Sequence, residues 1–213
     1  MSRSVLGLLV VLTLVGCTTA AHTNTVSAQS IALQPGDVSG LVRCAGSGDI
    51  QTVIGREKST DRGAASQYAV EWEQWKTQGA TEAYFAAYGQ TSTDCDALST
   101  IGTGAPTGGL IAGLVVTFKD QAIAARTYRA DSTLLGFGPK DIRFIQLVGG
   151  SVMTGTGTGL GPESVVGSGY VSGATYYFAF WQKKVVDSFF IAYDMPSAVA
   201  EGATRRVNQR MNW

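Results

Sequence analysis

The chain has 213 residues, with 16 Lys and Arg against 16 Asp and Glu, so its formal net charge at neutral pH is zero. Balanced charge without a basic block excludes the electrostatic attraction on which nucleic-acid binding depends, and we expect no nucleic-acid partner. With 45% hydrophobic and 15% charged residues, the chain can bury a substantial core. We therefore expect one folded domain rather than a disordered chain.

The first residues place one basic side chain, Arg3, before an apolar run from Val5 to Val15. That run is about half of the ~20 residues that a membrane-spanning helix needs, and small residues follow it, as in a cleaved export signal. Leu14-Val15-Gly16-Cys17 resembles the lipobox of bacterial lipoproteins. The resemblance implies that residues 1–16 are a signal peptide and that Cys17 carries lipid, a diacylglyceryl group with palmitate among the acyl chains.

Two alternatives remain for this leader. An ordinary secretory signal cut after Ala20 or Ala21 would release a secreted protein, and an uncleaved anchor would retain residues 1–16. All three interpretations export the chain. The lipoprotein interpretation implies a protein of the cell envelope, held by its N-terminal lipid on the extracytoplasmic side of a bacterial membrane.

Besides Cys17, the chain contains two cysteines, Cys44 and Cys95. An even pair in an exported protein is most simply a disulfide bond, which here would close a loop of 51 positions and stabilise the fold by about 4 kcal/mol. A pair of free buried thiols is the alternative.

The residues that follow Cys17 have no apolar periodicity and are rich in Thr, Ala, Ser and Gln. We interpret residues 17–36 as a flexible tether with a mean reach of about 25 Å, and residues 37–213 as the folded domain. Residues 37–60 are expected to be irregular, with one short strand. The glycines between residues 100 and 109 indicate a loop where two halves of the domain could meet.

The central and last parts of the chain show clearer elements. Apolar side chains three and four apart predict a helix over 64–78, and Gly79 is a plausible cap. Strands are expected at 84–88, 110–118 and 142–148, with a helical turn at Cys95 and a helix over 120–130. Three further strands at 163–172, 174–182 and 184–193 predict an antiparallel meander, and apolar residues four apart predict a closing helix over 197–211.

These elements predict an α+β fold in which a mainly antiparallel sheet is packed by about three helices. Helix and strand succeed each other near 65–88 and again near 120–148, which suggests a duplicated helix-strand module. From Leu110 onward, the order of strand, helix, meander and closing helix resembles the Mog1/PsbP-like domains of some exported bacterial lipoproteins. The resemblance covers about half of the chain, rests on element order, and implies no catalytic residues.

The inventory of reactive residues argues against an enzyme. The single histidine, His22, falls in the expected tether, so neither a Ser-His-Asp triad nor a His-rich zinc site can be assembled. We expect no catalytic residue, no metal and no cofactor. The glycine-rich run from Gly155 to Gly161 lacks the spacing of a phosphate loop, and a surface loop or a ligand rim are the alternatives. Solvated acids are the simpler interpretation of Asp94 and Asp96, against a carboxylate-only hydrolase.

Aromatic residues are the most distinctive remaining feature. They alternate along the expected strand 174–182, where Tyr177 and Trp181 share one face, and they either line a ligand pocket or pack in the core. We expect a non-catalytic envelope lipoprotein that binds a partner protein or an apolar small molecule through Tyr177 and Trp181. An accessory or assembly factor of an envelope complex is the alternative.

Overall fold

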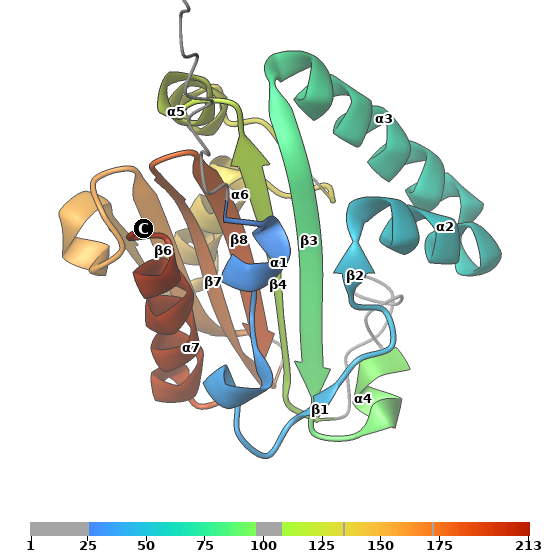
Figure 1. The fold of residues 1–213 in the computed structure, drawn as a ribbon. Coiled ribbons are helices and arrows are strands. Elements are labelled where there is room, and N and C mark those ends of the chain that lie inside the picture. The colour runs from blue at the N-terminus through green and yellow to red at the C-terminus, as the bar shows by residue number, and fades with distance from the viewer. Residues whose placement is uncertain (1–25, 97–107, 134, 172) are drawn as a thin grey trace, which may run out of the picture.

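The structure is a computed structural model that describes residues 26–96, 108–133, 135–171 and 173–213. An eight-stranded antiparallel sheet forms the centre, with helices on both faces, so the predicted α+β class is confirmed (Figure 1). Within these ranges no helix has both the length and the apolar character needed to cross a bilayer.

The strand order is β1-β3-β4-β8-β7-β6-β5, and β2 also pairs with β3. The strands are β1 (Val42–Arg43), β2 (Gly48–Asp49), β3 (Ala80–Gly89), β4 (Leu110–Phe118), β5 (Ser151–Thr154), β6 (Ser164–Val171), β7 (Ala174–Lys183) and β8 (Val186–Tyr193). The predicted meander is confirmed as β6, β7 and β8. Because β3 pairs with β4 along its whole length, one continuous sheet spans the two expected halves. Most of the predicted boundary loop at 100–109 lies outside the described residues.

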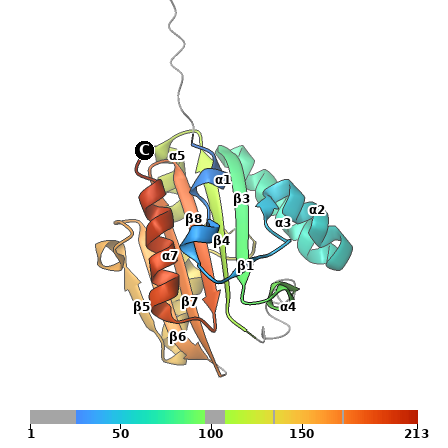
Figure 2. The same ribbon diagram turned by 60° about the horizontal axis from the view of Figure 1, so that its bottom comes forward.

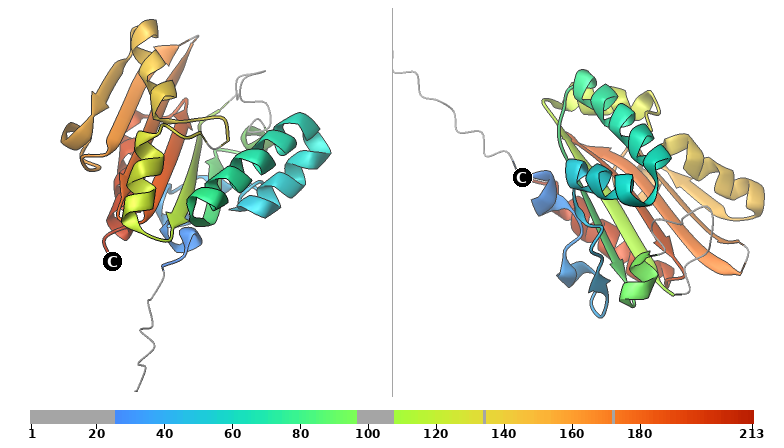
Figure 3. Two further views of the ribbon diagram at one scale, coloured as in Figure 1. Left: turned by 90° about the horizontal axis from the view of Figure 1, so that it is seen from above. Right: turned by 90° about the vertical axis from the view of Figure 1, so that its right-hand side faces the viewer.

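One face of the sheet, here called the α3 face, is covered by several helical segments (Figure 3). These are α2 (Ile50–Thr60), α3 (Arg62–Gln78), α5 (Gln121–Arg129), α6 (Pro139–Arg143) and the 3-10 helix η3 (Phe144–Val148). Asp61 caps α3 by accepting hydrogen bonds from the backbone of Gly63 and Ala64, and Trp72 and Trp75 face the sheet. The predicted helices at 64–78 and 120–130 are thereby confirmed.

The loop after α5 fastens α3 to the sheet. Trp75 Nε1 donates to the carbonyl of Thr133 at 2.9 Å, and the backbone of Gly136 donates to Glu71 Oε2 at 3.2 Å. Phe137 continues the loop into the core, where its ring stacks on Phe189 with centroids 5.0 Å apart. The α3 face is therefore closed by long-range contacts.

The predicted strand at 142–148 is wrong, because these residues form the end of α6 and η3. Asp141 accepts a hydrogen bond from the backbone of Gly138 at 2.7 Å, which starts α6. Ile142 and Ile145, three positions apart, then pack directly on the backbone of β6 and its neighbour. A Cβ atom at Gly167 would lie 2.7 Å from Ile142, and one at Gly150 would lie 2.4 Å from Ile145. The second of the two expected helix-strand units therefore has no strand at this position.

The opposite face, here called the α7 face, is covered by the closing helix α7 (Ser197–Arg210) (Figure 2). Ala203, Val207 and Met211 of the predicted stripe are fully buried against the sheet, so the predicted helix is confirmed. Val199, which also belongs to the predicted stripe, is 38% exposed, and Ala200 is buried in its place. Beside α7 lie the short helix α1 (Ala28–Ile31) and the 3-10 helix η1 (Pro35–Asp37).

The tether predicted for residues 17–36 is too long, since residues 26–36 belong to the fold. Ile31 and Leu33 are buried in the core of the α7 face. Arg210 of α7 donates to the carbonyls of Ile31 and Ala32 at 3.0 and 2.8 Å, and its guanidinium forms an ion pair with Asp37. The α1 segment has no apolar periodicity in its sequence. Its position depends on Arg210, which is distant in sequence.

The predicted disulfide between Cys44 and Cys95 is confirmed, with the Cα atoms 5.2 Å apart. Cys95 lies in α4 (Ser92–Asp96), the predicted helical turn. The helix α2 was not expected within 37–60. It starts at Asp49, whose carboxylate accepts from the backbone of Gln51 and Thr52.

Candidate functional site

Tyr177 and Trp181, the predicted ligand-binding pair, lie four positions apart on the α7 face of β7. Trp181 is fully buried and Tyr177 is 4% exposed, and both belong to the core cluster that includes α7. Burial raises the pKa of the Tyr177 hydroxyl to about 12. A ligand could reach either side chain only by displacing α7, so the alternative of core packing describes this structure.

Asp94 is not the solvated acid that was expected, and two acids of α3, Glu71 and Glu73, also have structural contacts. Asp94 is buried and accepts hydrogen bonds from the backbone and hydroxyl of Thr91, both at 2.8 Å. Glu71 is buried and holds the loop at Gly136, while Glu73 is exposed and pairs with Lys76 at 2.7 Å. No three His, Cys, Asp or Glu residues of the described ranges gather in a group that could hold a metal ion.

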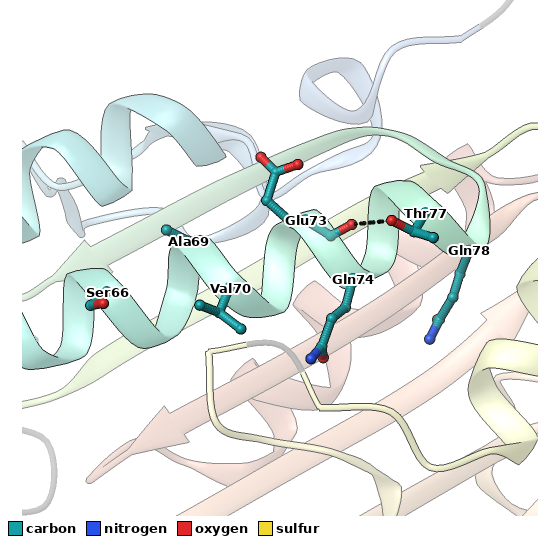
Figure 4. A pocket seen from close by; sticks show the side chains of 7 residues that line it. All are labelled: Ser66, Ala69, Val70, Glu73, Gln74, Thr77 and Gln78. Carbon is teal, nitrogen blue, oxygen red and sulfur yellow. Dashed lines mark hydrogen bonds between the residues drawn. The ribbon is translucent and has the colours of Figure 1, made fainter.

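An open groove of about 560 Å³ runs along the solvent-facing side of α3. Figure 4 shows its lining, which comes from one helix at helical spacing: Ser66, Ala69, Val70, Glu73, Gln74, Thr77 and Gln78. A small-molecule site usually encloses most of its ligand with several convergent polar groups. A groove lined by a single helix lacks that enclosure.

A second hollow lies inside the α3 face, between Trp75, Phe180 and Phe189. Its volume is about 10 Å³, which is room for one water molecule at most. Asp187 of β8 lines it, is 1% exposed, and has no hydrogen-bond partner for either carboxylate oxygen among the described residues. Burial raises the pKa of this carboxyl well above its usual value.

The clearest surface feature is a group of exposed apolar side chains around β5, here called the apolar rim. Its members, with their exposed fractions, are Leu147 (87%), Tyr170 (71%), Met153 (47%), Val148 (45%) and Phe144 (43%). Phe144, Leu147 and Val148 belong to η3 on the α3 face. Met153 is opposite Val166 of β6 on the α7 face, and Tyr170 lies farther along β6 on that same face. The rim therefore surrounds both faces of one sheet edge.

At this edge, β5 pairs with β6 on one side and with no strand of the described residues on the other. Figure 2 shows β5 at the outer border of the sheet, beyond the cover of α7. Exposed edge strands are normally protected by charges, especially Lys, or by Pro. Between Phe144 and Gln182, however, Glu163 is the sole Asp, Glu, Lys or Arg in the sequence.

This rim was not predicted from the sequence, although the sequence contains one signal for it. Residues 144–182 contain a single charged residue, which is unusual in this chain. The apolar residues of this segment, however, could equally well be buried in the core. Ile145 and Leu147 are both aliphatic, and only the fold makes one 1% and the other 87% exposed.

No protein-family model, no curated protein and no solved structure matches this chain at a significant level. The resemblance of the C-terminal half to Mog1/PsbP-like domains therefore stays a prediction.

Proposed function

We propose that the protein is a lipid-anchored protein of a bacterial envelope that binds a partner protein and performs no chemistry of its own. The observation that carries the proposal is the apolar rim around the unpaired edge of β5. Exposed apolar side chains gathered on one part of a folded protein are typical of interaction sites.

A partner protein fits the described residues better than an apolar small molecule. The interior hollow at Asp187 measures about 10 Å³, against the ~300–1,000 Å³ of ordinary ligand pockets. The groove on α3 is large enough but open and lined by one helix. By contrast, an edge strand offers backbone N–H and C=O groups in register, flanked by side-chain contacts.

We infer that the partner adds an extended segment to β5. In this mode, backbone hydrogen bonds supply affinity and alternate side chains supply specificity. The partner strand would contact Met153 on one face of the sheet and Leu147 on the other. The uncharged rim favours a partner segment that is itself apolar or uncharged, because a charge placed there would lose its hydration without gaining an ion pair.

The anchor is tested with the Cys17→Ala substitution. The lipobox predicts that the wild-type protein sediments with membranes and that its intact mass shows cleavage before Cys17 plus a lipid. Cys17→Ala should leave the membrane fraction or stay unprocessed. A mature wild-type protein that starts beyond Cys17 and carries no lipid would refute the anchor.

The rim is tested by site-specific photo-crosslinking in the intact envelope. A photoreactive side chain at position 147 should give one discrete crosslinked product, and Met153→Lys should abolish it by placing a charge on the pairing edge. The matched control is Val70, which is apolar and 56% exposed on α3. A probe at position 70 should give no such product, and Val70→Lys should leave crosslinking at position 147 intact. Identical crosslinking from both positions would contradict a role for the rim.

A further inference from the structure

The described part of the chain begins at one particular end of the sheet. The backbone of Ala28 donates to Glu82 Oε2 at 3.0 Å, and Glu82, near the start of β3, is paired with Thr117 of β4. The same row across the sheet continues through Thr117 and Val186 to Lys183. We call this the near end. The far end holds the disulfide, α4 and Tyr170, at the other ends of the same strands (Figure 1).

The last residue, Trp213, also lies at the near end. It is 42% exposed, whereas Trp72, Trp75 and Trp181 are at most 4% exposed. Lys184, in the β7–β8 turn, holds it in place: its ammonium donates to the Trp213 carbonyl and lies 5.6 Å from the ring centroid. Figure 3 shows α1 and the end of the chain close together in both views.

The near end combines this aromatic side chain with three lysines, Lys119, Lys183 and Lys184. Three acids lie at the same end. Glu82 and Asp120 accept backbone hydrogen bonds from Ala28 and Ile123, and Glu163, beside Gln182, pairs with Arg129 at 3.0 Å. A tryptophan beside lysines is typical of the zone of lipid headgroups, where the indole ring is amphipathic and ammonium groups meet phosphates. The charge excess is small, so the indole ring supplies the main contribution.

The short distance in sequence from Cys17 to Val26 limits which end of the sheet can face the membrane. Nine residues extend to about 30 Å at most. From Ala80 to Gly89, β3 also covers nine residue steps and spans about 30 Å from the near end to the far end. A chain fixed to lipid at Cys17 could therefore bring the far end to the membrane only if this connection were fully extended along the whole length of the sheet, at a large cost in conformational entropy.

Resting on the proposed anchor at Cys17, we propose that the near end contacts the headgroup layer of the membrane and that Trp213 inserts into it. The far end, with Tyr170, then points away from the membrane. This orientation leaves that part of the apolar rim open to a partner.

Brominated lipids test the contact, because bromine on the acyl chains quenches indole fluorescence at short range. The full lipidated protein is reconstituted in vesicles of phosphatidylethanolamine and phosphatidylglycerol with brominated chains. We expect quenching of the wild-type protein and its loss in Trp213→Phe. A Tyr170→Trp substitution in the Trp213→Phe background places an indole at the far end, and its fluorescence should stay unquenched.

Equal quenching of the wild-type protein and Trp213→Phe would overturn the proposal, as would quenching at position 170. Flotation with the vesicles separates this outcome from a failure of the anchor. If wild-type protein does not float, lipidation at Cys17 is refuted. If it floats and Trp213 is not quenched, the anchor stands and the near-end contact is refuted.

Discussion

Asp187 is a buried acid that lowers the stability of the core. Its carboxyl lies among the rings of Trp75, Phe180 and Phe189 without a hydrogen-bond partner in the described part of the chain. An ionised carboxylate in such a place would cost several kcal/mol, so burial raises the pKa of this carboxyl well above its usual value. The next residue, Ser188, is also buried with an unpaired hydroxyl. The free energy of unfolding is therefore lower than it would be with an apolar residue of similar size at position 187.

The raised pKa of Asp187 predicts a loss of stability as pH rises. Below about pH 4 the carboxyl is protonated in both states and has no effect on the pH dependence. Above that pH the unfolded chain releases the proton while the folded protein keeps it, so the free energy of unfolding falls by up to about 1.4 kcal/mol per pH unit until the raised folded-state pKa is reached. Asp187→Asn should remove this slope.

Urea unfolding at pH 4, 6 and 8 measures the effect. The stability of Asp187→Asn relative to wild type should increase from pH 4 to pH 8. A difference that is independent of pH would show that Asp187 ionises as easily in the folded protein as in the unfolded chain. Asp120→Asn is a suitable control, since Asp120 is an exposed acid on the surface.

At the scale of elements, the contact between α1, η1 and α7 depends on Arg210. Its guanidinium bonds both oxygens of Asp37, at 3.0 and 2.5 Å, and two carbonyls of α1 and its cap. Asp37 is 4% exposed, and without Arg210 its carboxylate keeps the ion pair with Arg206 at 3.3 Å and the hydrogen bond from the backbone of Gln34. Arg210→Ala removes charge-assisted hydrogen bonds but leaves the carboxylate paired, so it should cost about 2 kcal/mol in the free energy of unfolding.

The matched control is Arg205 on the same helix, whose pair with Glu201 is solvent-exposed. Arg205→Ala should change the free energy of unfolding by less than about 0.5 kcal/mol. Arg210→Ala should also make residues 26–38 a preferred site of limited proteolysis. Equal losses from both substitutions would mean that Asp37 does not need its partner.

The disulfide joins the segment before β2 to α4 and closes a loop of 51 positions. Cys44→Ala and Cys95→Ala should each lower the free energy of unfolding by about 4 kcal/mol, and the double substitution by no more than either alone. Urea unfolding without reductant measures these losses. Reductant should destabilise the wild type to a similar level and leave the double variant unchanged.

Elements with a strong period were predictable from the sequence, and elements defined by remote contacts were not. The four-residue spacing that buries Ala203 and Val207 sufficed for α7, and a continuous aliphatic run sufficed for β4. The run at 142–148 is short enough to be a strand or a helix, and glycines on β6 decide between them by admitting Ile142 and Ile145. The α1 segment depends on Arg210, and no local pattern records that contact. The aromatic residues of β7 indicated a candidate binding site at Tyr177 and Trp181. In the fold, α7 packs over these side chains and covers them.

At the scale of the whole molecule, the two termini of the described chain meet on one face. Residues 26–38 rest on α7, and the ion pair between Asp37 and Arg210 spans 173 positions of sequence. The α7 face of the sheet, including Trp181, is therefore covered only when the last helix is in place. Contacts so far apart in sequence form slowly, because a long loop must close first.

If the chain crosses a membrane with its N-terminus first, this arrangement determines the order in which its segments can fold. The segment after Cys17 would emerge first and have no α7 on which to fold until the final residues follow. In a chain exported as proposed, the site around Cys17 would be accessible to processing enzymes during that interval, while the uncovered strands would be exposed to proteases and to aggregation. Deletion of residues 197–213 should thus yield a protein that is still processed at its leader but is degraded before it accumulates.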